Sequence, residues 1–206
     1  MIRKMGNGLF VFGCVVLVIL AGIRNSGLSG EAYQQEISEA VLRLHVRADN
    51  NSPRAQQIKL SVRDEILHRL EKYEKDMKNK RSAKAVAKAH LKELQTAAGD
   101  VLKDWNCPYG VDIKIEKTWF PKKSYGDVTL PEGMYDAVVA ELGSGRGENW
   151  WCVLFPKLCF VTPEDGQVPQ SGKEALSEAL SKEAYDAITG YERPRFKIVE
   201  WFEKIW

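Results

Sequence analysis

Apolar and aromatic side chains are concentrated in one stretch of the chain, Asn149–Val161, which reads NWWCVLFPKLCFV. Each of its tryptophans and phenylalanines would bury about 150–250 Å² in a folded protein. Pro156 cannot donate a hydrogen bond to a neighbouring strand, so we expect two short extended pieces around a bend. This stretch is therefore predicted to form a corner of the core, with Cys152 and Cys159 brought together by the bend.

The N-terminus has the layout of an export signal. Arg3 and Lys4 precede an uncharged apolar run of fifteen residues, Leu9 to Ile23, and polar and small residues follow. A membrane-spanning helix needs about twenty apolar residues, so a signal peptide is favoured over a permanent anchor. We expect residues 1–29 to be a signal peptide or membrane anchor that gives transient membrane association, residues 30–38 a linker, and residues 39–206 one domain.

Export would place the cysteines in an oxidising compartment. Outside the leader the chain has three, Cys107, Cys152 and Cys159. An odd number leaves one thiol unpaired. The bend at Pro156 favours a disulfide between Cys152 and Cys159, although a buried pair of reduced thiols would give the same sequence pattern.

Hydrophobic periodicity predicts the first half of the domain. Residues 42–48 alternate apolar and polar side chains, which indicates a strand with one buried face. Ser52 and Pro53 are typical of a helix start. Apolar residues then recur every three to four positions, which predicts helices from Pro53 to about Met77 and from a Ser82 cap to Trp105. A short loop between them indicates an antiparallel pair.

The second half is predicted to be mainly strands. Residues 111–120, residues 134–140 and the Asn149–Val161 stretch are joined by short turns, which indicates an antiparallel meander. A helix from Lys173 to about Thr189 and a closing strand over residues 195–202 follow. The predicted fold class is α+β: a single domain with an antiparallel helix pair packed on a mostly antiparallel β-sheet, preceded by a signal peptide or N-terminal membrane segment.

Composition and motifs give little sign of catalysis or nucleic-acid binding. The chain carries 30 basic and 28 acidic residues, which is too balanced to indicate a nucleic-acid partner. It lacks a phosphate-binding loop, a zinc-ligand spacing and a nucleophile elbow. We read the glycines at 143, 145 and 147 as a hairpin turn. No metal, cofactor or small-molecule substrate is expected.

Polar residues on the first strand and helix are the candidates for partner binding. Arg43, His45 and Arg47 share one face of the strand, and Asp49 and Asn50 follow it. Arg63 and Asp64 lie beside the apolar stripe of the first helix. His45 also suggests an alternative, a secreted hydrolase in which the imidazole works with a carboxylate or a cysteine thiol. The simplest reading is a strand histidine that is hydrogen-bonded to its neighbours.

Four stretches together resemble the stage II sporulation protein R family of endospore-forming bacteria. They read LRLHVRADN at residues 42–50, KLSVRD at 59–64, SYGDVTLP at 124–131, and the Asn149–Val161 stretch. Their order and spacing also match. The resemblance covers about residues 40–161, weakens over residues 162–190 and returns at residues 196–200. The pattern NWWCxxxPxxCF is the most specific part of it.

The resemblance implies a signalling protein rather than an enzyme. Members of this family are made in the forespore and secreted into the intermembrane space of the sporangium. There they activate a membrane-embedded aspartic protease, which processes the pro-form of the early mother-cell sigma factor. The resemblance assigns no catalytic residues to this chain. The expected partner is therefore that protease, and the docking candidates are the polar residues named above.

Overall fold

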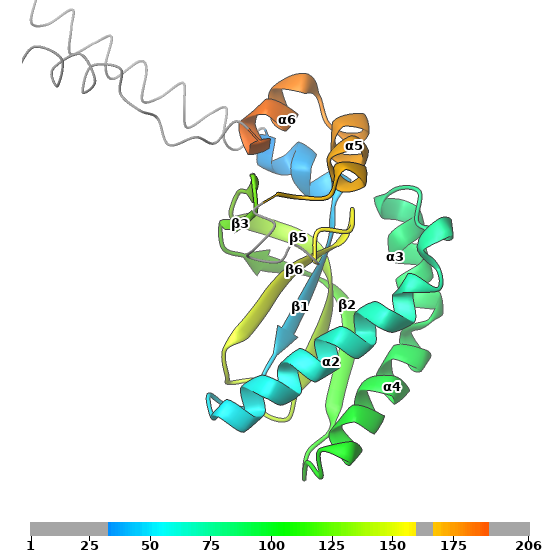
Figure 1. The fold of residues 1–206 in the computed structure, drawn as a ribbon, viewed down its shortest axis with the longest axis vertical. Coiled ribbons are helices and arrows are strands. Elements are labelled where there is room, and N and C mark those ends of the chain that lie inside the picture. The colour runs from blue at the N-terminus through cyan, green and yellow to red at the C-terminus, as the bar shows by residue number, and fades with distance from the viewer. Residues whose placement is uncertain (1–32, 160–166, 190–206) are drawn as a thin grey trace, which may run out of the picture.

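The computed structural model of the chain describes residues 33–159 and 167–189. A four-stranded sheet in the order β2-β5-β1-β6 forms its centre (Figure 1). The bounds are β1 Leu42–Arg47, β2 Val111–Phe120, β5 Gly133–Leu142 and β6 Asn149–Phe155, and a separate pair is formed by β3 Lys123–Tyr125 and β4 Val128–Leu130. Two of the three pairings in the larger sheet are antiparallel. These features confirm the predicted α+β class with a mostly antiparallel sheet.

Strand β1 occupies the middle of the sheet. It pairs parallel with β5 and antiparallel with β6. The predicted meander is therefore wrong in one pairing: β2 and β5 are antiparallel neighbours, but β1 lies between β5 and β6. The alternation in β1 predicted only one buried face. In the structure both faces of β1 are covered, because aromatic side chains enclose the polar residues on the second face. A strand that is buried on both faces is typical of the centre of a sheet.

The glycine-rich segment between β5 and β6 crosses the end of β1, where the sequence predicted a hairpin turn. Gly143 and Gly145 have φ of 55° and 61°, a region that favours glycine. The N–H of Gly147 donates to the carbonyl of Ala48 at 2.8 Å. A Cβ on Gly143 would lie 2.4 Å from the carboxylate of Asp49. The glycines thus allow the chain to pass close over the β1 end.

One layer of helices covers one face of the sheet (Figure 1). Helix α2 spans Pro53–Glu71, α3 spans Lys80–Ala89 and α4 spans Leu91–Asp104. As predicted, α2 begins at a Ser52 cap, whose hydroxyl accepts from the Ala55 N–H at 3.2 Å. Asn79, not Ser82, is the cap of α3, and Ser82 completes the reciprocal capping box three residues later. The antiparallel packing of α2 against α4 confirms the predicted helix pair.

Both predicted helices are interrupted near the same point. The first ends at Glu71 and a short 3₁₀ turn, Glu74–Asp76, follows; the second divides at His90. The rings of Tyr73 and His90 stack with centroids 3.7 Å apart, and the Tyr73 hydroxyl donates to Glu93 at 3.0 Å. Apolar spacing continues through both breaks, so periodicity alone predicted longer helices.

The second face of the sheet carries a mixed layer. Residues 33–40 are helical where the sequence predicted a linker, and Ile37 is buried in this layer. Two helices, α5 Gln170–Ala179 and α6 Lys182–Thr189, replace the single predicted one. They divide at Ser181, whose hydroxyl accepts from the Ala184 N–H at 3.3 Å and so caps α6. The β3–β4 pair completes the layer.

Two apolar clusters pack on opposite faces of the sheet. Leu44, Val46 and Val138 belong to the helix-side cluster, whereas Phe120, Tyr135 and Val153 belong to the other. Within residues 33–159 and 167–189, no helix is both long and apolar enough to span a bilayer. The predicted leader over residues 1–29 and the predicted strand over residues 195–202 lie outside the described residues.

Candidate functional site

Arg43 occupies a buried aromatic cage on β1. Its guanidinium carbon lies 4.1 Å from the ring centroid of Phe120, 4.9 Å from that of Tyr135 and 5.6 Å from that of Tyr125. Nε donates to the Cys152 carbonyl at 3.0 Å and Nη2 to the Tyr125 hydroxyl at 2.6 Å, whereas Nη1 has no hydrogen-bond partner among the described residues. Burial lowers the pKa of Arg43 and raises that of Tyr135 to about 12. The cage ties β1 to β2, β3, β5 and β6.

His45 lies next to this cage and is also buried. Its ring stacks on Trp151 with centroids 3.8 Å apart, and Nε2 donates to Asn149 Oδ1 at 2.8 Å. Nδ1 is without a partner in the described part of the chain. Burial lowers the pKa of His45 to about 4; the bond to Asn149 opposes this shift, and the positive charges of Arg47 and Arg43 add to it. The ring is therefore neutral near pH 7.

The remaining polar residues at the end of β1 hold local structure. Arg47 forms an ion pair with Glu141 at 3.5 Å. Asp49 accepts from the Ser144 N–H at 2.8 Å, which is the main cause of its lowered pKa, and from Asn50 at 2.8 Å. Asn50 in turn accepts from the Ser52 N–H at 2.9 Å. These contacts join the crossing segment to the start of α2.

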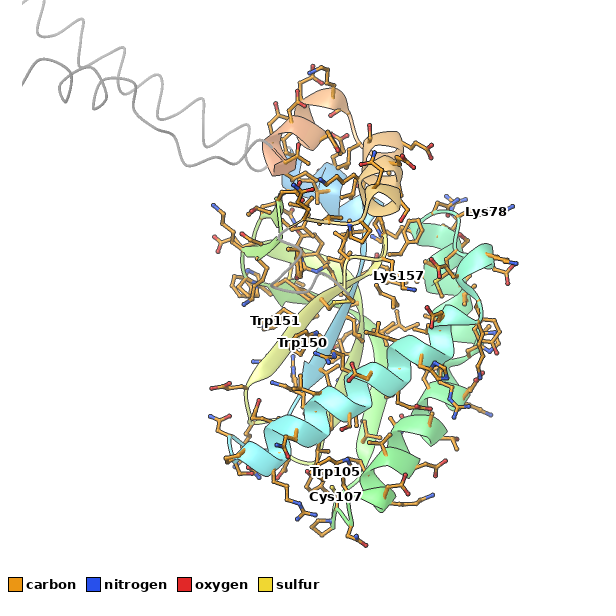
Figure 2. The ribbon with its side chains drawn as sticks, viewed as in Figure 1. Lys78, Trp105, Cys107, Trp150, Trp151 and Lys157 are labelled. Carbon is orange, nitrogen blue, oxygen red and sulfur yellow. A yellow bond between two sulfur atoms is a disulfide. The ribbon has the colours of Figure 1, made fainter. Side chains whose placement is uncertain are left out.

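Arg63 and Asp64 lie on the opposite side of the sheet from the β1 polar face. The Arg63 guanidinium stacks over Trp150 at 4.2 Å, and it forms an ion pair with Asp64 at 2.7 Å. Figure 2 shows Trp150 and Trp151 next to each other along β6. Adjacent residues of a strand point to opposite faces of the sheet. Trp150 therefore stacks with Arg63 on one face, and Trp151 stacks with His45 on the other. The structure thus does not gather the predicted docking residues into one surface.

The prediction that Arg43 and His45 lie on an exposed polar face is wrong. Their exposed fractions are 0 % and 1 %. The physical reason is that Phe120, Tyr125 and Tyr135 fold over the strand from elements that are distant in sequence. Arg47, Asp49, Asn50, Arg63 and Asp64 remain at least partly accessible.

The hydrolase alternative finds no supporting geometry in the described residues. The hydrogen bond of His45 goes to an amide, and no carboxylate or thiol is bonded to the ring there. Cys152 and Cys159 form a disulfide, as predicted, and Cys107 is a free thiol. In residues 33–159 and 167–189, no cluster of three or more His, Cys, Asp or Glu has the arrangement to hold a metal ion.

Removing the disulfide should destabilise the protein. The bond closes a loop between residues seven apart in sequence. Restricting such a loop in the unfolded chain stabilises the folded state by about 2 kcal/mol. We therefore expect the C152A/C159A double variant to lose about that much free energy of unfolding in urea titrations. The C107A variant is the matched control, and equal midpoints for the two variants would contradict the expectation.

An open groove separates α5 from the corner where α2 turns into α3. We call it the α5 groove. Its apolar end has a cavity of about 220 Å³. The residues that line this end include Leu67, Leu70, Met77, Leu154, Phe155, Pro156, Cys159, Gly172 and Ala175. Lys157 lies at its rim, between α5 and the helix pair (Figure 2), and pairs with Glu71 at 2.8 Å and Glu74 at 3.3 Å.

The other end of the α5 groove is charged. Phe155 and Ala175 line both the apolar end and a second hollow next to it. Asn79 and Lys80 line both this second hollow and a third. Asp136 there pairs with Lys80 at 2.7 Å and Lys84 at 2.8 Å. Partial burial favours the neutral carboxyl, but the bonds from the two lysines outweigh it and lower the pKa of Asp136. Four basic side chains line this end, Lys78, Lys80, Arg81 and Lys84, together with four acidic ones, Glu36, Glu39, Asp136 and Glu178.

Sequence reasoning missed both the cage and the α5 groove. The cage gave no local signal, because Phe120, Tyr125 and Tyr135 lie far from Arg43 in the sequence. The α5 groove likewise had no local signal in the sequence. Its walls come from α2, β6 and α5, which only the tertiary fold brings together.

Comparison with known proteins finds similarity to a family of sporulation proteins. The family model for stage II sporulation protein R matches residues 38–165. The protein named stage II sporulation protein R from Bacillus subtilis (strain 168) is 29% identical over 191 residues, which cover 88% of this chain and 85% of that protein. No solved structure matches the chain.

Fold and site together define an α+β protein with a surface groove of mixed apolar and charged character. The chain belongs to the stage II sporulation protein R family, because the family model covers more than half of its length. This membership gives the chain a role in sporulation.

Proposed function

We propose that this protein is an exported sporulation signal that activates a membrane-embedded aspartic protease. In this proposal the forespore secretes the chain into the intermembrane space, where its N-terminal segment can associate transiently with a membrane. The activated protease then processes the pro-form of the early mother-cell sigma factor. Membership of the stage II sporulation protein R family is the observation that carries the proposal.

The α5 groove is the best docking surface for such a partner. At its apolar end a side chain of the partner would lose contact with water, and at its charged end charged or polar residues of the partner can form pairs. An activator must bind the active state of the protease more tightly than the inactive state, by about 1.4 kcal/mol for each tenfold shift in the equilibrium. Arg47 and Asp49 can add contacts, but their bonds within the fold make them secondary candidates.

Reconstitution in a non-sporulating bacterium tests the proposal. The full-length chain, the protease and the pro-form of the sigma factor are produced together, and processing is followed by immunoblot. We expect processed sigma factor only when all three are present and the protease retains its catalytic aspartates. Absence of processing with all three proteins exported and folded would refute the proposal.

Variants of α5 test the docking surface in the same system. Ala175 lines the α5 groove, whereas Ser177 on the same helix is exposed and does not line it. A175R would fill the groove and place a cation over its apolar end, so we expect processing to fall by about tenfold or more. S177R is the matched control and should process normally. Equal processing by two folded variants would show that the docking surface lies elsewhere.

A further inference from the structure

Strand β2 forms one edge of the sheet. It pairs with β5 on one side, in an unbroken antiparallel register from Val111 to Phe120. In such a ladder, alternate residues direct their backbone N–H and C=O groups toward the partner strand and away from it. The outward groups of an edge strand are free to pair with another chain.

Gln95 of α4 shows which residues of β2 point outward. Its side-chain nitrogen donates to the Val111 carbonyl, and its side-chain oxygen accepts from the Ile113 N–H at 2.8 Å. Gln95 thus satisfies the outward groups at the start of β2 in the way that a neighbouring strand would. By the two-residue alternation, Ile115, Lys117 and Trp119 also direct their backbone groups outward.

Beyond the Gln95 contact, the outward groups of this edge have no partner in the part of the chain that the structure describes. Within residues 33–159 and 167–189, no hydrogen bond reaches the outward N–H or C=O groups of Ile115, Lys117 and Trp119. Three outward residues in succession can pair with an extended segment of about five residues. The edge therefore has the length that strand addition requires.

The side chains beside this edge favour a particular kind of segment. Trp119 is 51 % exposed and Met134, its register partner on β5, is 45 % exposed; they are the large exposed hydrophobic residues of the described chain. Lys117 lies opposite Asp136, whose carboxylate is already paired with Lys80 and Lys84. Two lysines thus pair with this carboxylate and a third lies opposite it in the register, next to an exposed apolar pair.

We propose that the outer edge of β2, from Ile115 to Trp119, accepts an extended segment of the protease by strand addition. Because Lys117 and Trp119 lie on the same face, the segment carries an acidic residue opposite the first and an apolar residue opposite the second, two positions apart. This proposal rests on the proposed function and deepens it. Asp136 belongs both to this surface and to the charged end of the α5 groove, so one partner can occupy the two together.

Amide hydrogen exchange of the full-length chain, with and without the detergent-solubilised protease, tests this pairing. The outward amides of Ile115, Lys117 and Trp119 are expected to exchange freely in the chain alone and to slow by about tenfold or more in the complex. The amides of Lys114 and Glu116 face β5 and serve as an internal reference, protected in both samples. Unchanged exchange of the outward amides in a complex that does form would overturn strand addition while leaving the proposed function intact.

A second copy of the chain is the competing occupant. Protection of the outward amides without the protease, rising with protein concentration, would overturn the proposal in favour of self-pairing. Failure of the chain to bind the protease at all would instead count against the proposed function. The three results are therefore distinguishable in one experiment.

Substitution at Lys117 gives an independent test in the processing system. K117P removes an outward N–H that the β2–β5 ladder does not use, and proline is tolerated at such edge positions. K117A keeps the N–H and removes the charge. We expect processing to fall by about tenfold or more with K117P and by less with K117A. Full processing by folded K117P would overturn the proposal, and if K117P does not fold, the exchange experiment decides.

Discussion

Replacing Arg43 with alanine is expected to lower the free energy of unfolding by about 3–5 kcal/mol. The substitution removes the hydrogen bonds to the Cys152 carbonyl and the Tyr125 hydroxyl, and it leaves a cavity between Phe120 and Tyr135. Urea unfolding of the purified protein measures the loss. Because the residue is buried, any loss of signalling in R43A would come from a damaged fold rather than from a lost partner contact.

An Arg43→Met variant separates the charge from the volume. Methionine fills much of the same space and needs no hydrogen bonds, and replacing buried charges by apolar groups is often neutral. We therefore expect R43M to be clearly more stable than R43A and to retain signalling. If R43A unfolds at the same urea concentration as the unchanged protein, the cage does not stabilise the fold.

Acidification from about pH 6.5 to about pH 4 is expected to destabilise the protein through His45. Its pKa is about 4 in the folded state against an ordinary 6.5, so the unfolded chain takes up the proton first. The contribution of His45 is fully present above about pH 6.5, falls with pH and is exhausted near pH 4. Each unit of difference between the folded and unfolded pKa of His45 corresponds to about 1.4 kcal/mol of stability. Water that reaches the protonated ring reduces this cost, so we expect the free energy of unfolding to fall by about 2–3 kcal/mol.

The H45Q variant isolates this effect, because glutamine can still bond to Asn149 and does not titrate. Urea unfolding at several pH values should show a shallower slope in this window for H45Q than for the unchanged protein. The charged groups that act on His45 are Arg47 and Arg43, and both disfavour protonation of its ring. Identical slopes for the two proteins would contradict a buried neutral His45.

The fold class was predictable because local patterns agreed with the final packing. The alternation in β1 and the Ser52 cap of α2 each identified an element correctly, and Pro156 marked the end of β6. The cysteines around that bend do form the predicted disulfide. Strand order was not predictable in the same way, since it depends on which strand can be buried on both faces. The second face of β1 is buried only by aromatic residues that are distant in sequence.

The site was harder to predict than the fold. Arg43 and His45 have polar side chains on a strand with alternating pattern, which usually marks a solvent-facing side. Their burial depends on Phe120, Tyr125 and Tyr135, and no local rule connects these residues with β1. The Gln95 contact with β2 is similar: a glutamine on a helix gives no sign that it will satisfy the edge of a strand.

The most direct test of the account is site-specific photo-crosslinking in the reconstituted processing system. A photoreactive amino acid is placed at residue 175 in the α5 groove or at residue 177 on the outer side of the same helix. The account predicts a covalent adduct with the protease from position 175 and little from position 177, under conditions in which the sigma factor is processed. Processing without an adduct at 175, or with equal adducts at both positions, would contradict activation by docking in the α5 groove.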